Sequence, residues 1–524
     1  MMGRSAPALR GATALVLAGT LISGCMVGPD FHRPTVASPP TFAPVDRATA
    51  PSRPEASPIA ADWWTLFNDP KLSLLESRLA GANLDVKAAT ARLFQSRAQR
   101  RIAGARAYPS VGAAGSYNRE RASPNGILSL MGTGPAGSQQ QSANGSAPFG
   151  VSSLPGSDGS PPYDLWQVGI DASWELDLWG RARRGVEAAN AALQETLEDR
   201  RAILLSAQAE LARDYVELRT TQALLAITRH NLDDARDSVK LTRLRLEQGV
   251  TTSLDVADAE AQLATIEARL PALNARQDAL INALSLLLAE QPGALAGELG
   301  DMGDVPALPE RVPVGLPSEL ARRRPDIRQA EAALHRATAE IGVAQADFYP
   351  SISLTGSFGT QSLALSNFGS WASHQFIVGP SISLPFFQGG RLKGALELRK
   401  AEQQEAAIRF QQTVLKAWHE IDDALTAYDA EQRRSDRLGE AVRQNRLALS
   451  VAQRRYREGA VDFLNILSVQ RALLSAENDL AESHGQAAAN LVVLLKALGG
   501  GWERTFPDAP VRSQPITTGA STGS

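Results

Sequence analysis

Four short segments of the chain alternate apolar residues with small or polar ones, and this pattern predicts β-strands that have one apolar face. The segments cover residues about 110–119, 166–177, 351–360 and 376–386. In the last segment Phe376, Val378 and Ile382 fall on one face, whereas Ser381 and Ser383 fall on the other. A two-faced pattern over about ten residues is typical of transmembrane barrel strands, although amphipathic sheets of soluble proteins show it too.

The segments that follow each pair of strands have a helical pattern. Between Gly185 and Gly249 the chain contains neither glycine nor proline, and between Gly394 and Gly459 only Gly439 interrupts the run. We expect long helices over about 181–248 and 391–458, each roughly 100 Å long at 1.5 Å per residue. After a glycine-marked turn, returning helices are predicted over about 253–290 and 463–498. Their apolar residues recur at 3-4 spacing, which favours a long coiled coil over an ordinary helical bundle.

The two halves of the chain are copies of one unit. The segment that begins at Arg245 matches the segment that begins at Arg455, 210 residues later. Further upstream, Tyr108-Pro109-Ser110 recurs 241 residues later as Tyr349-Pro350-Ser351. The two offsets differ because the first copy carries an insertion of 31 residues that is rich in Gly, Ser, Gln and Pro. Such a composition is typical of a loop.

One chain offers four predicted strands, which are too few to close a barrel. An open sheet edge in lipid leaves N–H and C=O groups unpaired, at several kcal/mol each. Two chains would supply eight strands, whose interior side chains would fill the barrel, whereas three would supply twelve and leave a lumen. The small polar residues on one face favour the twelve-stranded barrel.

Composition changes this picture at the N-terminus. Cys25 is the only cysteine among 524 residues, and it follows a basic start and a short apolar run. That run, of about 11 residues, is too short to span a bilayer and reads as a secretory signal. The sequence Ile22-Ser23-Gly24-Cys25 fits a bacterial lipobox, so we expect cleavage before Cys25 and an N-acyl and S-diacylglycerol lipid on it. The alternative is an ordinary signal peptide with a chance cysteine. Met26, rather than Asp, in the second mature position favours the outer membrane.

These features divide the chain into five parts. We expect a signal peptide over residues 1–24, a lipidated Pro-rich linker over 25–61, a first structural repeat over 62–306, a second repeat over 307–503 and a flexible tail over 504–524.

The remaining composition points away from catalysis and nucleic acid. The formal net charge is −3 and the pI about 6.2, so no nucleic-acid partner is indicated. The six histidines are scattered without metal-ligand spacing, and no phosphate-binding or nucleophile-elbow motif is present. We expect no enzyme activity, no catalytic, cofactor-binding or metal residues, and no cofactor apart from the lipid on Cys25.

Several short motifs together resemble those of a known family. They are Cys25-Met26-Val27-Gly28-Pro29-Asp30, Trp63-Trp64, the run from Leu316 to Glu331, Tyr349-Pro350-Ser351, the run from Arg455 to Gly459, and the run that ends at Trp502. With them the chain resembles the outer membrane factors, the TolC-like channels of tripartite resistance-nodulation-division (RND) efflux pumps, in their NodT-type lipoprotein branch. The resemblance spans nearly the whole chain.

This resemblance implies a fold class and partners. The expected fold is a mixed α and β membrane protein, a homotrimer with a 12-stranded transmembrane β-barrel that continues as a periplasmic α-helical coiled-coil barrel. The implied partners are a periplasmic adaptor (membrane fusion protein), an inner-membrane RND-type transporter and outer-membrane lipid. The implied function is a passive exit duct for drugs or other small toxic solutes. Two alternatives remain open: the outer channel of a type I protein secretion system, and a structural periplasmic lipoprotein without a channel.

By the same resemblance, the tips of the helical hairpins form the periplasmic mouth. The gate candidates are Asp462, Leu464, Asp258 and Asp255, and the adaptor-contact candidates are Arg245, Gly249, Arg455 and Gly459. Ser468 stands where family members often carry an aspartate. The alternative role for Asp462 and Asp255 is helix capping, since both stand at the start of a predicted helix.

Overall fold

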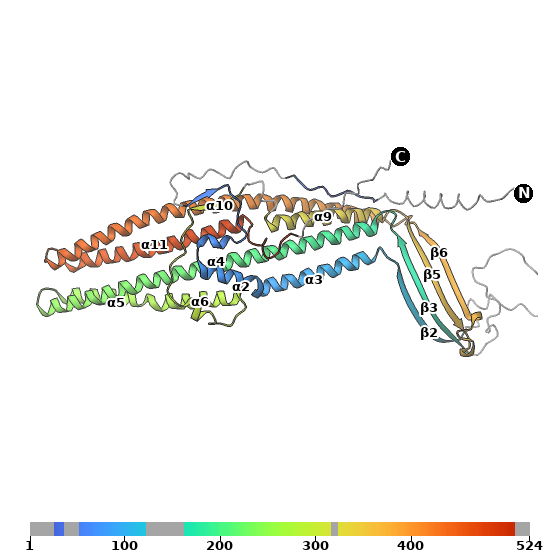
Figure 1. The fold of residues 1–524 in the computed structure, drawn as a ribbon, viewed down its shortest axis with the longest axis horizontal. Helices are drawn as coiled ribbons and strands as arrows, with labels where there is room; N and C mark the ends of the chain where they lie inside the picture. The colour runs from blue at the N-terminus through green and yellow to red at the C-terminus, as the bar shows by residue number, and fades with distance from the viewer. Residues whose placement is uncertain (1–25, 36–51, 122–161, 316–322, 509–524) are drawn as a thin grey trace, which may run out of the picture. The chain divides into compact units, whose positions relative to one another are not determined.

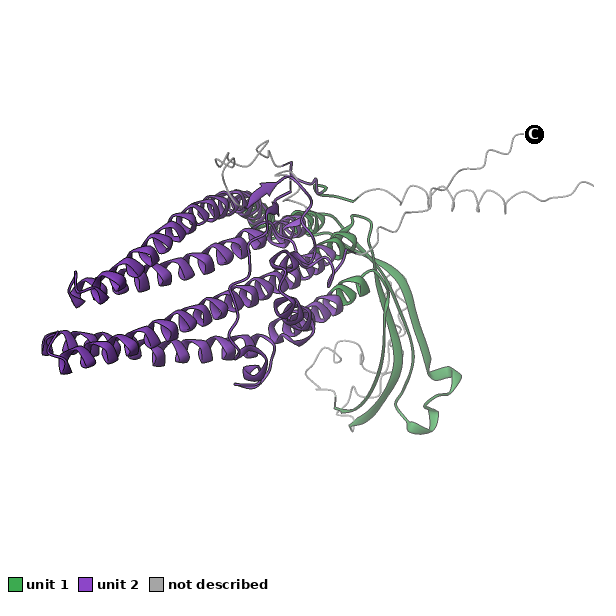
Figure 2. Ribbon diagram, turned by 60° about the vertical axis from the view of Figure 1, so that its left-hand side comes forward, with its two compact units in different colours: residues 1–30, 100–188, 338–401 green, residues 31–99, 189–337, 402–524 purple. Residues whose placement is uncertain are grey.

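The computed structural model describes residues 26–35, 52–121, 162–315 and 323–508 (Figure 1). The chain forms two compact units, each drawn from separate stretches of sequence. Unit 1 comprises residues 1–30, 100–188 and 338–401, and unit 2 comprises residues 31–99, 189–337 and 402–524 (Figure 2). Each unit therefore contains parts of both sequence repeats.

Unit 1 is built on a four-stranded antiparallel sheet with the strand order β2-β3-β5-β6. The strands are β2 (Ser110–Glu120), β3 (Tyr163–Leu176), β5 (Ser351–Ser362) and β6 (His374–Ser383). Two short 3-10 helices, η4 (Leu365–Asn367) and η5 (Trp371–Ser373), connect β5 to β6. β2 and β6 are the edge strands, and no other strand of the described residues pairs with their outer edges.

The register places the apolar positions of the four strands in common rows. Ile170 lies opposite Ala113 on one side and Phe358 on the other, and Phe358 lies opposite Phe376. Because successive side chains of a strand point to opposite faces, the neighbouring row through Asp171 belongs to the other face. The sheet thus has one apolar and one polar face, as the alternating pattern predicts.

Unit 2 is mainly helical. It contains α2 (Pro70–Ala82), α5 (Ser253–Glu267), α6 (Arg269–Leu287), α7 (Ala296–Leu299) and α11 (Phe463–Ala497), and parts of α3 (Leu84–Ala105), α4 (Arg181–Glu247), α9 (Pro325–Ala346) and α10 (Arg391–Arg457). A short 3-10 helix, η1 (Trp63–Phe67), and a parallel pair of strands, β1 (Arg53–Glu55) and β4 (Arg311–Pro313), complete it. None of the helices in the described ranges combines the length and apolarity needed to cross a bilayer.

Equivalent helices of the two repeats have equal lengths, except in the returning segment. α4 and α10 each contain 67 residues, and α3 and α9 each contain 22. α11 is one helix of 35 residues, whereas its counterpart is broken after Glu267 into α5 and α6. The single helix expected over about 253–290 is therefore interrupted. Pro271 explains the break, because it has no N–H to donate to Glu267 and its ring clashes with that carbonyl. Ala481 holds the equivalent position in α11.

The core of unit 2 joins helices from both repeats around the N-terminal end of α2. Trp63, Phe67 and Tyr215 are fully or almost fully buried in it. Asp69 caps α2 by accepting hydrogen bonds from the backbone N–H groups of Lys71 and Leu72, at 2.8 and 3.1 Å. The hydroxyl of Tyr215 donates to the other carboxylate oxygen of Asp69 at 2.7 Å. One acid therefore fixes both the start of α2 and its position on α4.

Candidate functional site at the helical hairpin tips

The first hairpin turns through a glycine in the left-handed region. Gly249 has φ +67°, its N–H donates to the carbonyl of Leu246 at 2.9 Å, and the N–H of Val250 donates to the carbonyl of Arg245 at 2.9 Å. This pattern ends α4 by satisfying its last carbonyls, and glycine adopts the required φ without strain. The turn leads directly into the first residues of α5.

A capping box starts α5. The hydroxyl of Thr252 accepts from the N–H of Asp255 at 3.4 Å, and the carboxylate of Asp255 accepts from the N–H of Thr252 at 3.0 Å. The hydroxyl of Thr251 also donates to this carboxylate at 2.6 Å. The hydrogen bonds from Thr251 and then Thr252 hold the pKa of Asp255 below its usual value. The carboxylate of Asp255 is therefore engaged in capping.

The second hairpin repeats the turn with a different cap. Gly459 has φ +76°, and the N–H of Ala460 donates to the carbonyl of Arg455 at 2.9 Å. Asp462 then caps α11, since its carboxylate accepts from the backbone N–H of Asn465 at 3.2 Å and from the side-chain amide of the same residue. Leu464, on the first turn of α11, is 48% exposed.

An arginine joins the two tips. The guanidinium of Arg245 lies 4.0 Å from the ring centre of Tyr456 and donates to the carbonyl of Tyr456 at 3.1 Å. Tyr456 in turn packs against Phe463, with ring centres 6.0 Å apart. A cation over an aromatic face is worth about 0.5–2 kcal/mol, depending on exposure. The first hairpin is thus fastened to the second.

The predicted site residues therefore divide into groups with different surroundings. Arg245 is half-buried and used within the chain, whereas its repeat counterpart Arg455 is exposed, with no side-chain hydrogen bond or ion pair among the described residues. Asp462 and Leu464 are exposed at the second tip, and Asp258 is half-buried on α5. No described hydrogen bond joins the four gate candidates to one another.

Sequence reasoning missed Tyr456, because its contact with Arg245 links residues 211 positions apart.

Several predicted features lie outside the described residues: the signal peptide and Cys25, residues 36–51 of the linker, most of the insertion between β2 and β3, and the tail after residue 508. Among the described residues, no group of three or more His, Cys, Asp or Glu side chains could hold a metal ion.

A duplicated chain with one half-apolar sheet and two very long, tightly turned helical hairpins defines the class of TolC-like outer membrane channels. The model of the family described as outer membrane efflux protein matches residues 75–290 and 316–500, and the chain belongs to that family. The TolC-like, mixed α and β fold predicted from the sequence and the resemblance that supported it are thereby confirmed.

Three similar proteins illustrate the relationship. The probable efflux pump outer membrane protein TtgC of Pseudomonas putida is 32% identical over 93% of this chain and 95% of its own. Nodulation protein T of Rhizobium leguminosarum bv. trifolii is 29% identical over 92% of this chain and 96% of its own. The solved outer-membrane channel OprN superposes with a TM-score of 0.80, at 33% identity, over 91% of this chain and all of its own. The protein is accordingly an outer membrane efflux channel, and the predicted function is confirmed at this level.

Proposed function

We propose that the chain forms a lipid-anchored homotrimer that serves as the passive exit duct of a tripartite efflux system. A periplasmic adaptor and an inner-membrane RND-type transporter deliver drugs or other small toxic solutes to its mouth. The observation that carries this proposal is the pair of open sheet edges on β2 and β6. In lipid the unpaired groups of an open edge cost several kcal/mol each, and three chains satisfy them by closing twelve strands.

The internal repeat supports the same arrangement in the helices. Glu198 and Leu205 of α4 are buried, with relative exposures of 0% and 6%. Arg328 of α9 covers Glu198 through an ion pair of 2.9 Å. The residues 210 positions later, Ile408 and Leu415 of α10, are 49% and 53% exposed. The face of α4 that carries Glu198 and Leu205 is therefore covered within the chain. The equivalent face of α10, which carries Ile408 and Leu415, is exposed.

A neighbouring chain offers the matching cover. α3 is the repeat counterpart of α9, and its Phe94 is 60% exposed, whereas the equivalent His335 of α9 is half-buried. A head-to-tail contact of α3 from one chain with α10 of the next would reproduce the α9–α4 contact. Repeated contacts of this heterologous kind close into a ring when the rotation permits.

The hairpin tips suit the adaptor end of such a duct. The turns at Gly249 and Gly459 expose short loops, and Arg455 presents an uncommitted cation beside the second loop. Asp462 and Leu464 stand next to it as gate candidates. Energy comes from the inner-membrane transporter, and the duct opens and closes without doing chemistry.

A pair of matched substitutions tests the trimer. Leu415→Arg should reduce the heat-sensitive trimer band of purified outer membranes, because it places a charge in the proposed interface. Leu447→Arg is the control, since Leu447 on the same helix is 60% exposed and its repeat counterpart Asp237 is exposed as well. Equal loss in both variants, or no loss in either, would overturn the arrangement.

Planar-bilayer recordings test the duct. The purified trimer should conduct ions, and the conductance should rise when the tips are loosened. A stable trimer that never conducts, even with altered tips, would instead indicate a structural periplasmic lipoprotein.

A further inference from the structure

A buried arginine in unit 1 contacts the segment that follows Cys25. The side chain of Arg184, on the first turn of α4, is only 1% exposed. Its guanidinium donates to the carbonyls of Val27 and Gly28, at 3.3 and 3.2 Å, and to the carboxylate of Asp30 at 2.7 Å. It also donates to the carboxylate of Glu187 at 2.8 Å. Residues 26–30 are called the neck below.

The neck also bonds through its own backbone. The N–H of Val27 donates to the carbonyl of Trp179 at 3.0 Å, just before α4 begins. Because Arg184 engages two carbonyls and Val27 offers an amide, the contact recognises the course of the neck backbone as well as the charge of Asp30. A planar guanidinium with five donors suits such multiple recognition better than an ammonium group does.

Three glycines let the neck approach this closely. Gly28 has φ +95°, and a Cβ on it would lie 2.4 Å from the Cα of Gly342 on α9. Gly180 has φ +84°, and a Cβ there would lie 2.4 Å from Cγ of Met26. A Cβ on Gly342 would lie 2.8 Å from the aliphatic part of Arg184. Larger residues at these positions would push the neck away or force a strained backbone.

Among the described residues, the second repeat has no equivalent of the contact between Arg184 and the neck. The residue 210 positions after Arg184 is Gly394, and a Cβ built on it would meet nothing within 4 Å. Gly180 does have a counterpart, Gly390, with φ +86°. The positive-φ turn therefore serves both repeats, whereas the buried arginine belongs to the repeat that receives the neck.

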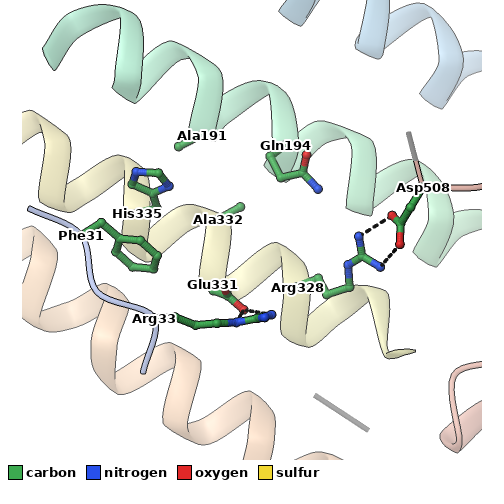
Figure 3. A pocket seen from close by; sticks show the side chains of 9 residues that line it. All are labelled: Phe31, Arg33, Ala191, Gln194, Arg328, Glu331, Ala332, His335 and Asp508. Carbon is green, nitrogen blue, oxygen red and sulfur yellow. Dashed lines mark hydrogen bonds and ion pairs between the residues drawn. The ribbon is translucent and has the colours of Figure 1, made fainter. Parts of the chain in front are cut away.

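Residues 31–33, which follow the neck, belong to unit 2 and contact α9 there. Phe31 stacks on His335 of α9 with ring centres 4.3 Å apart and planes 14° from parallel. Arg33 forms an ion pair with Glu331 at 2.7 Å. These four side chains line a cavity of about 350 Å³ together with Arg328 and Asp508, which form an ion pair of 2.7 Å. Figure 3 shows the two ion pairs and the neighbouring rings of Phe31 and His335.

We propose that Arg184 with Gly28, Gly180 and Gly342 is a clamp for the neck, and that this clamp fixes where the lipid anchor joins the body of the channel. The proposal rests on the lipidation of Cys25 set out above. Cys25 directly precedes Met26 in the sequence, so the clamp acts one residue from the acylated position. The anchor and the strand-bearing unit then insert as one body, and the acyl chains are not on a free tether.

Spin-label mobility in the neck tests the clamp. Pro29 is exposed, so Pro29→Cys places a reporter there with little disturbance. The label should be immobilised in the otherwise unchanged trimer. Gly28→Ala should abolish the immobilised component, because the added Cβ meets the backbone of α9. Arg184→Gln should abolish it too.

Gly185→Ala is the matched control, since this glycine adjoins Arg184 but its Cβ would meet nothing within 4 Å. It should leave the spectrum unchanged. A label that is already mobile in the parent, or one that stays immobilised in both Gly28→Ala and Arg184→Gln, overturns the clamp. Gly28 lies outside the helices and strands, so an intact trimer band in Gly28→Ala separates loss of the clamp from misfolding.

The same preparation separates this proposal from the lipidation on which it rests. A chain without Pro29→Cys takes up no thiol label when Cys25 carries the lipid, because its sulfur is then part of a thioether and no thiol remains. Labelling of Cys25 would contradict the lipid anchor, whereas the Gly28→Ala spectrum would still decide the clamp.

Discussion

Asp214 of α4 is a partly buried carboxyl whose charge is poorly compensated. Its side chain is 13% exposed, and its nearest cation, Arg213, lies 3.7 Å away and is largely exposed. Burial raises the pKa of Asp214 to about 6, Arg213 opposes the rise, and Glu210 and Glu217 add to it. The charged form is thus disfavoured in the folded chain.

The stability of unit 2 should therefore depend on pH at this residue. A carboxyl whose pKa is raised on folding makes the folded state less stable as pH climbs from about 4 to about 6, because the unfolded chain ionises first. Asp214→Asn should raise the free energy of unfolding at pH 7.5 by up to about 3 kcal/mol per chain, at 1.4 kcal/mol per pKa unit, and by little at pH 4. Thermal denaturation at both pH values measures it. The exposed Asp233→Asn is the control, and an equal shift at both pH values would refute the explanation.

Two substitutions of Asp462 distinguish a role in helix capping from a role in the gate. Asp462→Ala removes both the charge and the cap of α11, at a cost of about 1 kcal/mol for the cap. Asp462→Asn keeps a capping side chain and removes only the charge. If a ring of three carboxylates constricts the mouth, both variants, each combined with Leu464→Ala, should raise single-channel conductance in planar bilayers. If the conductance rises in the variant with Asp462→Ala but not in the one with Asp462→Asn, the effect is due to the lost helix cap. If it rises in neither variant, the gate lies elsewhere.

At the level of elements, the sequence predicts what local patterns determine. The near-absence of glycine and proline predicts the length of α4 and α10. The alternation of apolar and polar residues predicts the two faces of the four strands. The break between α5 and α6 was missed because the apolar residues at 3-4 spacing up to Leu270 were given more weight than Pro271, the local signal for the break. The contacts of Arg184 and Arg245 were missed as well, since each joins residues more than 150 positions apart and leaves no local signal.

Exchanging one residue between the returning segments should transfer the break. Pro271→Ala should join α5 and α6 into one helix, because the missing donor is restored. Ala481→Pro should interrupt α11 and destabilise its hairpin by about 3 kcal/mol. Hydrogen exchange of the amides near residues 268 and 478 measures both. Unchanged protection near residue 268 in Pro271→Ala would mean that tertiary packing, and not proline, breaks the helix.

At the level of the whole molecule, the proposed lipid would give the protein a second attachment to the membrane besides its sheet. The sheet presents an apolar face on every strand, and the proposed lipid on Cys25 adds acyl chains. One acyl chain alone gives marginal binding, and stable anchoring takes a second signal. The barrel supplies that second signal. We therefore expect the lipid to matter more for delivering the protein to the outer membrane than for keeping it there.

Cys25→Ser should accordingly abolish incorporation of radiolabelled palmitate while leaving much of the trimer in the outer membrane. Membrane fractionation and the heat-sensitive trimer band measure the second effect. Palmitate that persists in the variant would disprove the lipobox. Complete loss of the trimer would show that assembly depends on the anchor.

The equal lengths of α4 and α10 restrict how this chain can change in evolution. A single inserted turn in α4 would carry the first tip about 5 Å beyond the second and part Arg245 from Tyr456. An insertion is tolerated only if the outgoing and returning helices of both repeats gain the same number of residues at the same height. Steps of seven residues keep the packing seam in register. The span of the duct is therefore inherited as a unit, and relatives with longer or shorter tunnels should differ by matched blocks in all four segments.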